Sequence, residues 1–154
     1  MKPDRHHARI LAMQILCQVD VQGAAVFEHP RDSLGEGRVR AATWTHALRI
    51  AREGWDHRDH LDRRIARHLE RWDLQRLSPV ERNLIRVALV ELETAEVPPK
   101  VVINEAVEIA RKFGGADSPR FVNGILDALW KENQELAPCT PERRPAGVDP
   151  APKT

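Results

Sequence analysis

Basic side chains cluster at the amino-terminal end of the chain: Lys2, Arg5, His6, His7 and Arg9. The following residues predict a helix that Asp4 caps. Cations at a helix N-terminus oppose the helix dipole, so helix stability does not explain the cluster. Positively charged side chains bind the phosphates of nucleic acids. The segment is therefore a candidate phosphate-binding site, and an ordinary solvated arm is the alternative.

A second group of candidate binding residues follows Pro119, at the predicted start of the last helix. It contains Arg120, Phe121 and Asn123. A helix N-terminus offers free N–H groups to phosphate. An exposed aromatic side chain beside an arginine can stack on an unpaired base. The group is typical of a site for single-stranded nucleic acid, whereas core packing is the alternative role for Phe121.

No set of residues forms a catalytic constellation, so the sequence predicts no enzyme. Gly114-Gly115 lacks the pattern of a phosphate-binding loop. Neither Cys17 nor Cys139 has the paired histidine that would activate a nucleophile. His57 and His60 are three residues apart and could share a metal on one helix face, but the region offers no convincing third ligand. We therefore expect no metal and no cofactor.

Composition limits the classes of protein. The 24 basic and 23 acidic side chains give a net charge of +1. This balance argues against indiscriminate nucleic-acid binding but allows local basic patches. No apolar run reaches the roughly 20 residues of a membrane span, and the N-terminus lacks the apolar core of a signal peptide. We expect a cytoplasmic protein without membrane association and, with two distant cysteines, without a structural disulfide.

The spacing of apolar residues predicts helices throughout and no sheet, which indicates an all-α fold. The first two helices are expected at about residues 4–21 and 38–53, the third from Asp56 through Trp72, the fourth from Ser78 to Pro98, the fifth at about 100–113 and the last from Asp117. Residues 22–37, which contain Pro30, Gly35 and Gly37, are predicted to be a loop.

Local signals mark several of these helix ends. Ser78-Pro79-Val80-Glu81 is a capping box with proline at the first helical position. We expect Gly54 to end the second helix and Asp56 to cap the third. Gly114-Gly115 should end the fifth helix in a left-handed turn. Gly124 lies inside the last helix, where close approach of a neighbouring helix would explain it.

Two further regions have a distinctive composition. Arginines crowd the third helix among interleaved acidic residues, which favours a solvated face over a binding patch. The last 18 residues hold five of the chain's 11 prolines and little that could form a core, so we expect a disordered tail. The predicted domains are therefore a helical domain at 1–136 and a Pro-rich tail at 137–154.

Three stretches resemble the NusB family. Residues 101–114 read VVINEAVEIARKFG, similar to the family's INEAVELAKKFG. Residues 117–127 read DSPRFVNGILD, similar to its D-S-x-[KR]-F-V-N-G-[IV]-L-D. Residues 81–92 read ERNLIRVALVEL, similar to its E-[KR]-x-[IL]-[IL]-R-[IL]-A-[LV]-x-E-[LM] helix. The resemblance covers about residues 4–130 and implies a NusB-like fold of two packed helical bundles.

The resemblance also implies a function and the residues that perform it. It implies binding of boxA-type single-stranded RNA together with NusE, a small-subunit ribosomal protein, in a transcription elongation complex that supports ribosomal RNA transcription and processing. The RNA-facing residues would be the basic N-terminal cluster, with Lys2, and the helix start, namely Asp117, Ser118, Arg120, Phe121 and Asn123. The partner-facing surface would include Glu81. The resemblance leaves open whether the chain forms a homodimer.

Two departures from the family pattern affect the RNA assignment. Family members often carry arginines where this chain has His6 and His7. Neutral histidine releases no counterion, so we expect weaker or pH-dependent binding. The family's frequent tyrosine is Cys17 here.

Two other hypotheses are a helical protein-interaction scaffold without RNA binding and the isolated NusB-like domain of an RNA cytosine methyltransferase.

Overall fold

The computed structural model describes residues 2–34, 38–69 and 74–136. Its elements, in chain order, are α1 (Arg5–Gln22), η1 (Ala24–Glu28), α2 (Pro30–Leu34), α3 (Ala41–Asp56), α4 (Arg58–Ala66), η2 (Leu74–Arg76), α5 (Pro79–Thr94), α6 (Pro99–Phe113) and α7 (Ser118–Leu136). The described residues form helices and no strand, which confirms the all-α prediction. None of their helices is long and apolar enough to cross a membrane.

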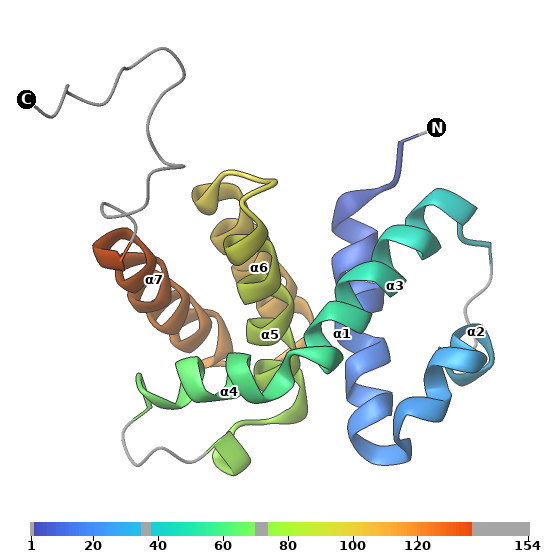
Figure 1. The fold of residues 1–154 in the computed structure, drawn as a ribbon, viewed down its shortest axis with the longest axis horizontal. Helices are drawn as coiled ribbons and strands as arrows, with labels where there is room; N and C mark the ends of the chain where they lie inside the picture. The colour runs from blue at the N-terminus through green and yellow to red at the C-terminus, as the bar shows by residue number, and fades with distance from the viewer. Residues whose placement is uncertain (1, 35–37, 70–73, 137–154) are drawn as a thin grey trace, which may run out of the picture.

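The helices form two groups that meet along α1 and α5. Helix α1 packs on α3, η1 and α2, while α5 packs on α6, α7 and α4. Contacts of α5 with α1 and α3 join the groups. Figure 1 shows α1–α3 on one side of the molecule and α4–α7 on the other. This arrangement agrees with the two packed bundles expected from the sequence.

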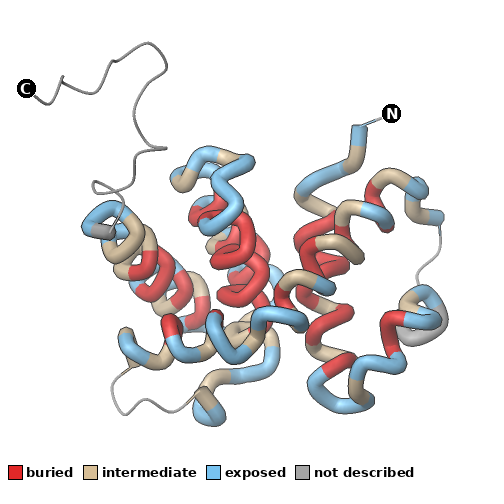
Figure 2. Tube along the Cα trace, viewed as in Figure 1, coloured by how far each residue is buried: buried red, intermediate tan, exposed pale blue. Residues whose placement is uncertain are grey.

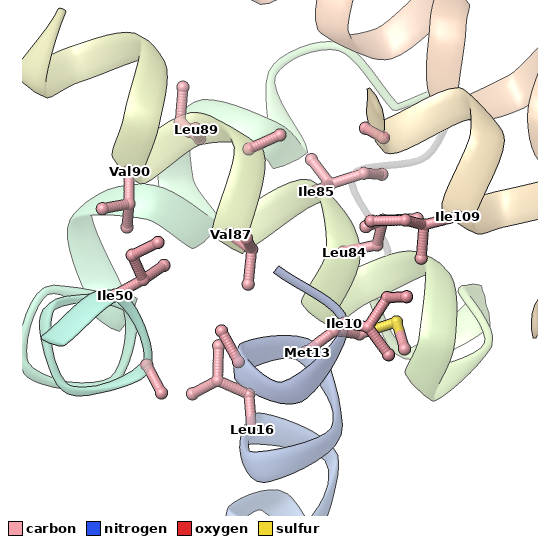
Figure 3. Packing of buried hydrophobic residues seen from close by; sticks show 14 of the residues in the cluster. Ile10, Met13, Leu16, Ile50, Leu84, Ile85, Val87, Leu89, Val90 and Ile109 are labelled. Atoms are coloured by element: carbon pink, nitrogen blue, oxygen red, sulfur yellow. The ribbon is translucent and has the colours of Figure 1, made fainter. Parts of the chain in front are cut away.

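The core lies where the two groups meet. Figure 3 shows side chains of α1, α3, α5 and α6 converging there; they include Ile10, Met13, Leu16, Ile50, Leu84, Val87, Val90 and Ile109. Every residue of α5 from Asn83 to Leu92 is buried. Figure 2 shows the buried faces turned toward one another and the outer faces exposed. The predicted stripe on α5 is confirmed, but its other faces are also covered.

The start of α5 matches the sequence prediction. The Ser78 hydroxyl accepts a hydrogen bond from the Glu81 N–H at 3.1 Å, and the Glu81 carboxylate accepts one from the Ser78 N–H at 3.2 Å. Asp4 likewise caps α1 by accepting from the His7 N–H at 3.0 Å. Both motifs connect residues three positions apart, so local sequence is enough to specify them.

The predicted loop at residues 22–37 is not what the described part of it, residues 22–34, forms. It contains η1 and α2. Val26 and Phe27 are buried and join the core cluster around α1. The prediction was wrong because burial of these two side chains stabilises η1, and Leu34 of α2 also packs against the core. Glycine and proline spacing alone does not reveal this burial.

The glycines and Asp56 also play different roles from those predicted. Helix α3 continues through Gly54, where an added Cβ would lie 3.1 Å from Leu16 Cδ1, so the glycine allows α1 to approach. The residue before α4 is His57, not Asp56, and it makes no side-chain cap. Gly114 has φ −98° rather than a left-handed conformation. A Cβ added at Gly124 would meet no atom within 4 Å, so close approach of a helix does not explain this glycine.

The predicted third helix is shorter than expected, and one of its arginines is not solvated. Helix α4 ends at Ala66, and Trp72 lies outside the described residues. Arg64 is buried and donates to Glu93, Glu132 and Asn133 at 2.6–2.9 Å. Its guanidinium joins α4 to α5 and α7. The solvated-face interpretation is therefore wrong for Arg64, because its partners come from helices far along the chain.

Candidate nucleic-acid interface

The amino-terminal cluster divides into exposed and enclosed side chains. Lys2 and Arg5 are exposed beside the first turn of α1. The backbone N–H of Asp4 donates to the Thr43 hydroxyl at 3.0 Å, which ties this turn to the start of α3. The turn is therefore held by the fold. Lys2 and Arg5 present their charge to solvent, as a phosphate contact requires.

His6 is turned toward α6. Its Nδ1 lies 2.8 Å from Glu105 Oε1, and its side chain is 42% exposed. His7 is half-buried. A protonated His6 would have its charge offset by the Glu105 carboxylate, which weakens its contribution to phosphate binding. The pH-dependent RNA binding expected from these two histidines stays a prediction, and the His6–Glu105 contact makes His7 the freer of the two.

Arg9 does not belong to the exposed cluster. Its guanidinium donates to both carboxylate oxygens of Glu91, at 2.6 and 3.0 Å, and to Glu105 at 3.2 Å. The residue is only 5% exposed. Burial lowers the pKa of Arg9, but the hydrogen bonds and charge of Glu91, with those of Glu105, raise it above its ordinary value. Arg9 is thus a buried structural cation in this fold, and this geometry does not favour the direct RNA contact that was predicted for it.

Ser118 is likewise enclosed at the start of α7. Its hydroxyl donates to Glu81 Oε2 at 2.5 Å and accepts from the Gly115 N–H at 3.0 Å. The residue is buried. Its hydroxyl is already used by two protein groups, so direct contact of Ser118 with a ligand, as predicted, is not what this geometry offers. Ser118 instead fixes the turn that precedes α7 in the chain.

The other predicted residues of this helix start reach solvent. Asp117, Arg120 and Asn123 are exposed. Phe121 is half-buried and packs against the core cluster. Core packing is therefore part of its role, although the residue is not fully enclosed. Arg120 supplies the positive charge here. The chemistry available is a phosphate contact from Arg120, with polar contacts from Asn123.

The exposed cations at the start of α1 lie beside the middle of α6, and Arg120 follows the turn after its end. The His6–Glu105 contact places the first turn of α1 beside the first half of α6. Phe113 ends α6, and the turn after it leads directly into α7. Glu105 and Phe113 are eight positions apart, which corresponds to about 12 Å along a helix axis. A ligand that contacts both groups must therefore extend along α6, as a flexible single strand can.

Two residues beside this surface were missed or misjudged from sequence. Glu105 was assigned no role in binding from the sequence, but it accepts hydrogen bonds from the amino-terminal cluster. Phe113 received no role, yet the residue is 38% exposed at the end of α6. The available signal was its position just before two glycines, which marks Phe113 as the last residue of its helix.

Glu81, the predicted partner-facing residue, is half-buried. One carboxylate oxygen serves the cap of α5 and the other accepts from Ser118. Cys17, which lies near the same helix start, donates from its thiol to the Pro79 carbonyl at 3.6 Å. Burial raises the pKa of the Cys17 thiol, which favours an unreactive, protonated group. Cys139 lies outside the described residues.

The histidine pair considered for metal binding is engaged elsewhere. His57 Nδ1 lies 3.1 Å from the Glu53 carbonyl, and His60 Nε2 lies 2.9 Å from Glu93 Oε2. Within the described part of the chain, no group of three or more histidine, cysteine or acidic residues is placed to hold a metal ion.

Comparison with known proteins gives consistent matches. The NusB family model matches residues 6–131. The transcription antitermination protein NusB of Nitratiruptor sp. is 38% identical over 128 residues, which cover 83% of this chain and 92% of that protein. The corresponding protein of Chloroflexus aggregans is also 38% identical, with 81% and 85% of the two chains covered. These relatives are named as antitermination proteins rather than as enzymes.

Solved structures show the same fold. The structure of T. maritima NusB is 34% identical and aligns with a TM-score of 0.76 over 86% of this chain and 94% of that one. A structure of the antitermination factors NusB and NusE in complex with dsRNA contains a chain that is 26% identical. It aligns with a TM-score of 0.70 over 83% of this chain and 96% of that one.

Proposed function

This chain belongs to the NusB family, and from that premise we propose that it is a transcription antitermination factor. In this proposal it binds boxA-type single-stranded RNA together with NusE, as part of the transcription elongation complex in the cytoplasm. Its role is to support transcription and processing of ribosomal RNA. The observation that carries the proposal is the 38% identity to an antitermination protein across almost the whole of that relative.

The exposed residues of the two helix starts support RNA binding. Lys2 and Arg5 on one side and Arg120 on the other can contact phosphates, and the half-buried Phe121 is proposed to stack on a base. The near-neutral net charge of +1 means that few phosphates are neutralised. We therefore expect weak RNA binding by the chain alone, with a shallow dependence on salt, and tighter binding in the presence of NusE.

The partner contact is proposed at the start of α5, around Glu81.

The solved NusB–NusE complex contains double-stranded RNA, whereas the proposal for this chain is a single-stranded site. Stacking on an aromatic ring requires unpaired bases. A comparison of the two forms of RNA is therefore part of the test.

The test is a fluorescence anisotropy titration of labelled boxA-type RNA, single-stranded and as a duplex, with and without NusE. We expect the single strand to bind more tightly than the duplex, and NusE to increase its affinity. Arg120→Ala should weaken binding and reduce the salt slope by roughly 0.7, the value for one phosphate of a single strand.

Lys131→Ala is the matched control, because Lys131 is on the same helix, about three turns beyond Arg120, and is paired with Asp127 at 3.1 Å. It should bind like the wild type. RNA affinity that is unchanged by NusE would contradict the adaptor function. Absence of any RNA binding, with NusE bound normally, would favour the protein-interaction scaffold instead.

A further inference from the structure

The Glu81 carboxylate joins the starts of two helices that carry different proposed surfaces. Its Oε1 accepts from the Ser78 N–H at 3.2 Å, at the start of α5. Its Oε2 accepts from the Ser118 hydroxyl at 2.5 Å, at the start of α7. The Ser118 oxygen accepts in turn from the Gly115 N–H at 3.0 Å. A single chain of hydrogen bonds therefore connects the proposed partner-facing residue with the turn that precedes the RNA-facing helix.

Close packing holds this chain of hydrogen bonds in place. A Cβ at Gly114 would lie 2.6 Å from Ser118 Cβ and 2.8 Å from the Ala110 carbonyl oxygen, so only glycine fits without displacement. Its φ of −98° is accessible to any residue, so space rather than backbone conformation requires the glycine. Ser118 is 3% exposed. The turn at residues 114–117 is thus fixed against the end of α6 and against Glu81.

We infer that Glu81 and Ser118 are positioning residues for RNA, acting through their mutual hydrogen bond; this inference rests on the proposed function. Neither side chain needs to touch the nucleic acid. Their bond fixes the 114–117 turn and the first turn of α7, so that Asp117 and Arg120 already face solvent in a defined arrangement. A site that is ordered before binding loses less conformational entropy when its ligand arrives.

A substitution at Glu81 is therefore expected to have two separate effects. Loss of this carboxylate would loosen the start of α7 as well as alter the proposed partner surface. Ser118→Ala separates the two effects, because Ser118 is buried. It removes the Oε2 contact while leaving Glu81 and its α5 cap in place.

The experiment measures RNA affinity by fluorescence anisotropy with NusE at saturating concentration. Wild type is compared with Ser118→Ala, Glu81→Ala, the double variant and Ser78→Ala, each at a temperature where circular dichroism shows it folded. Ser118→Ala should bind roughly threefold to tenfold more weakly, the loss expected for about one hydrogen bond. The double variant should lose less affinity than the sum of the two single losses, since the two residues share one contact.

Ser78→Ala is the matched control. It removes the other half of the capping box but leaves the Glu81–Ser118 bond, so it should lower thermal stability and keep wild-type RNA affinity. Hydrogen exchange supplies a second readout: the Gly115 amide should exchange faster in Ser118→Ala than in Ser78→Ala.

Three results would overturn the inference. The first is wild-type RNA affinity in folded Ser118→Ala, even with faster exchange at Gly115, because the bond would then be structural only. The second is an additive loss in the double variant, and the third is an equal loss in Ser78→Ala. Failure of the wild type to bind RNA with NusE present would be distinct from these, since it overturns the proposed function and this inference with it.

Discussion

Arginines in this protein serve two different purposes, and burial separates them. Arg9, Arg64 and Arg86 are almost fully buried and bonded to carboxylates of other helices. Arg5 and Arg120 are exposed at helix starts. A buried guanidinium must satisfy its donors within the protein, whereas an exposed one is free to contact phosphate. The same residue type therefore stabilises the fold at one position and is available for binding at another.

Arg9 provides the sharpest test of the buried role. Arg9→Met should lower the free energy of unfolding by about 3–5 kcal/mol, because it leaves the Glu91 carboxylate buried without its partner. Urea unfolding followed by circular dichroism measures the change. The double variant Arg9→Met/Glu91→Met should be more stable than Arg9→Met alone, since no charge then remains buried. If Arg9→Met instead kept wild-type stability and lost RNA affinity, Arg9 would be an RNA contact after all.

At the scale of elements, the short helix α4 is held by polar contacts as well as by packing. Leu61 and Ile65 bury its apolar side. Arg64 and His68 both contact the Glu132 carboxylate of α7, at 2.9 and 3.0 Å. Burial raises the pKa of Glu132, but the hydrogen bonds from Arg64 and His68 outweigh it and lower the pKa below its ordinary value. The ionised carboxylate therefore contributes to the attachment of α4 to α7.

This lowered pKa predicts a loss of stability in acid. The contribution of Glu132 is complete above the pKa of an unfolded glutamate, about 4.3. It disappears as the pH falls through the lower pKa of the folded state. Glu132→Gln should therefore be less stable than wild type at pH 7, and the difference should shrink as the pH falls from about 5 to 3. Urea unfolding at each pH measures it.

Glu108→Gln is the control for this prediction, because Glu108 forms an exposed ion pair with Arg111 one turn away on the same helix. Such pairs contribute little, so its stability should follow that of wild type at every pH. A constant difference between Glu132→Gln and wild type down to pH 3 would show that the charge of Glu132 is not what stabilises the contact.

At the scale of the whole molecule, α5 is the element that both helical groups share. It is buried along most of its length and contributes Glu91 to α1, Glu93 to α4 and Glu81 to α7. The two groups therefore lack separate cores. We expect them to unfold together, as a single cooperative unit with one transition.

The predicted domain boundary can be tested on the same basis. Residues 137–154 lie outside the described part of the chain, and their composition predicts no contribution to a core. A chain ending at residue 136 should therefore unfold at the same temperature as the full chain, within about 1 °C, in a calorimetric scan. It should also bind boxA-type RNA with the same affinity. A clear drop in unfolding temperature would place part of this segment against the folded domain.

Features that depend on neighbours a few residues apart could be predicted from the amino-acid sequence. Apolar spacing indicated the main helices, and the Ser78–Glu81 capping box indicated the start of α5, because both arise within one or two helical turns. Motif resemblance also identified the family. Only the packing of the helices determined which polar residues are free: Arg9 meets Glu91 across 82 positions, and Ser118 meets Glu81 across 37. Packing also formed η1 by burying Val26 and Phe27, and Leu34 of α2 packs against the same core. Burial depends on which helices pack together, and no local pattern encodes partners that distant.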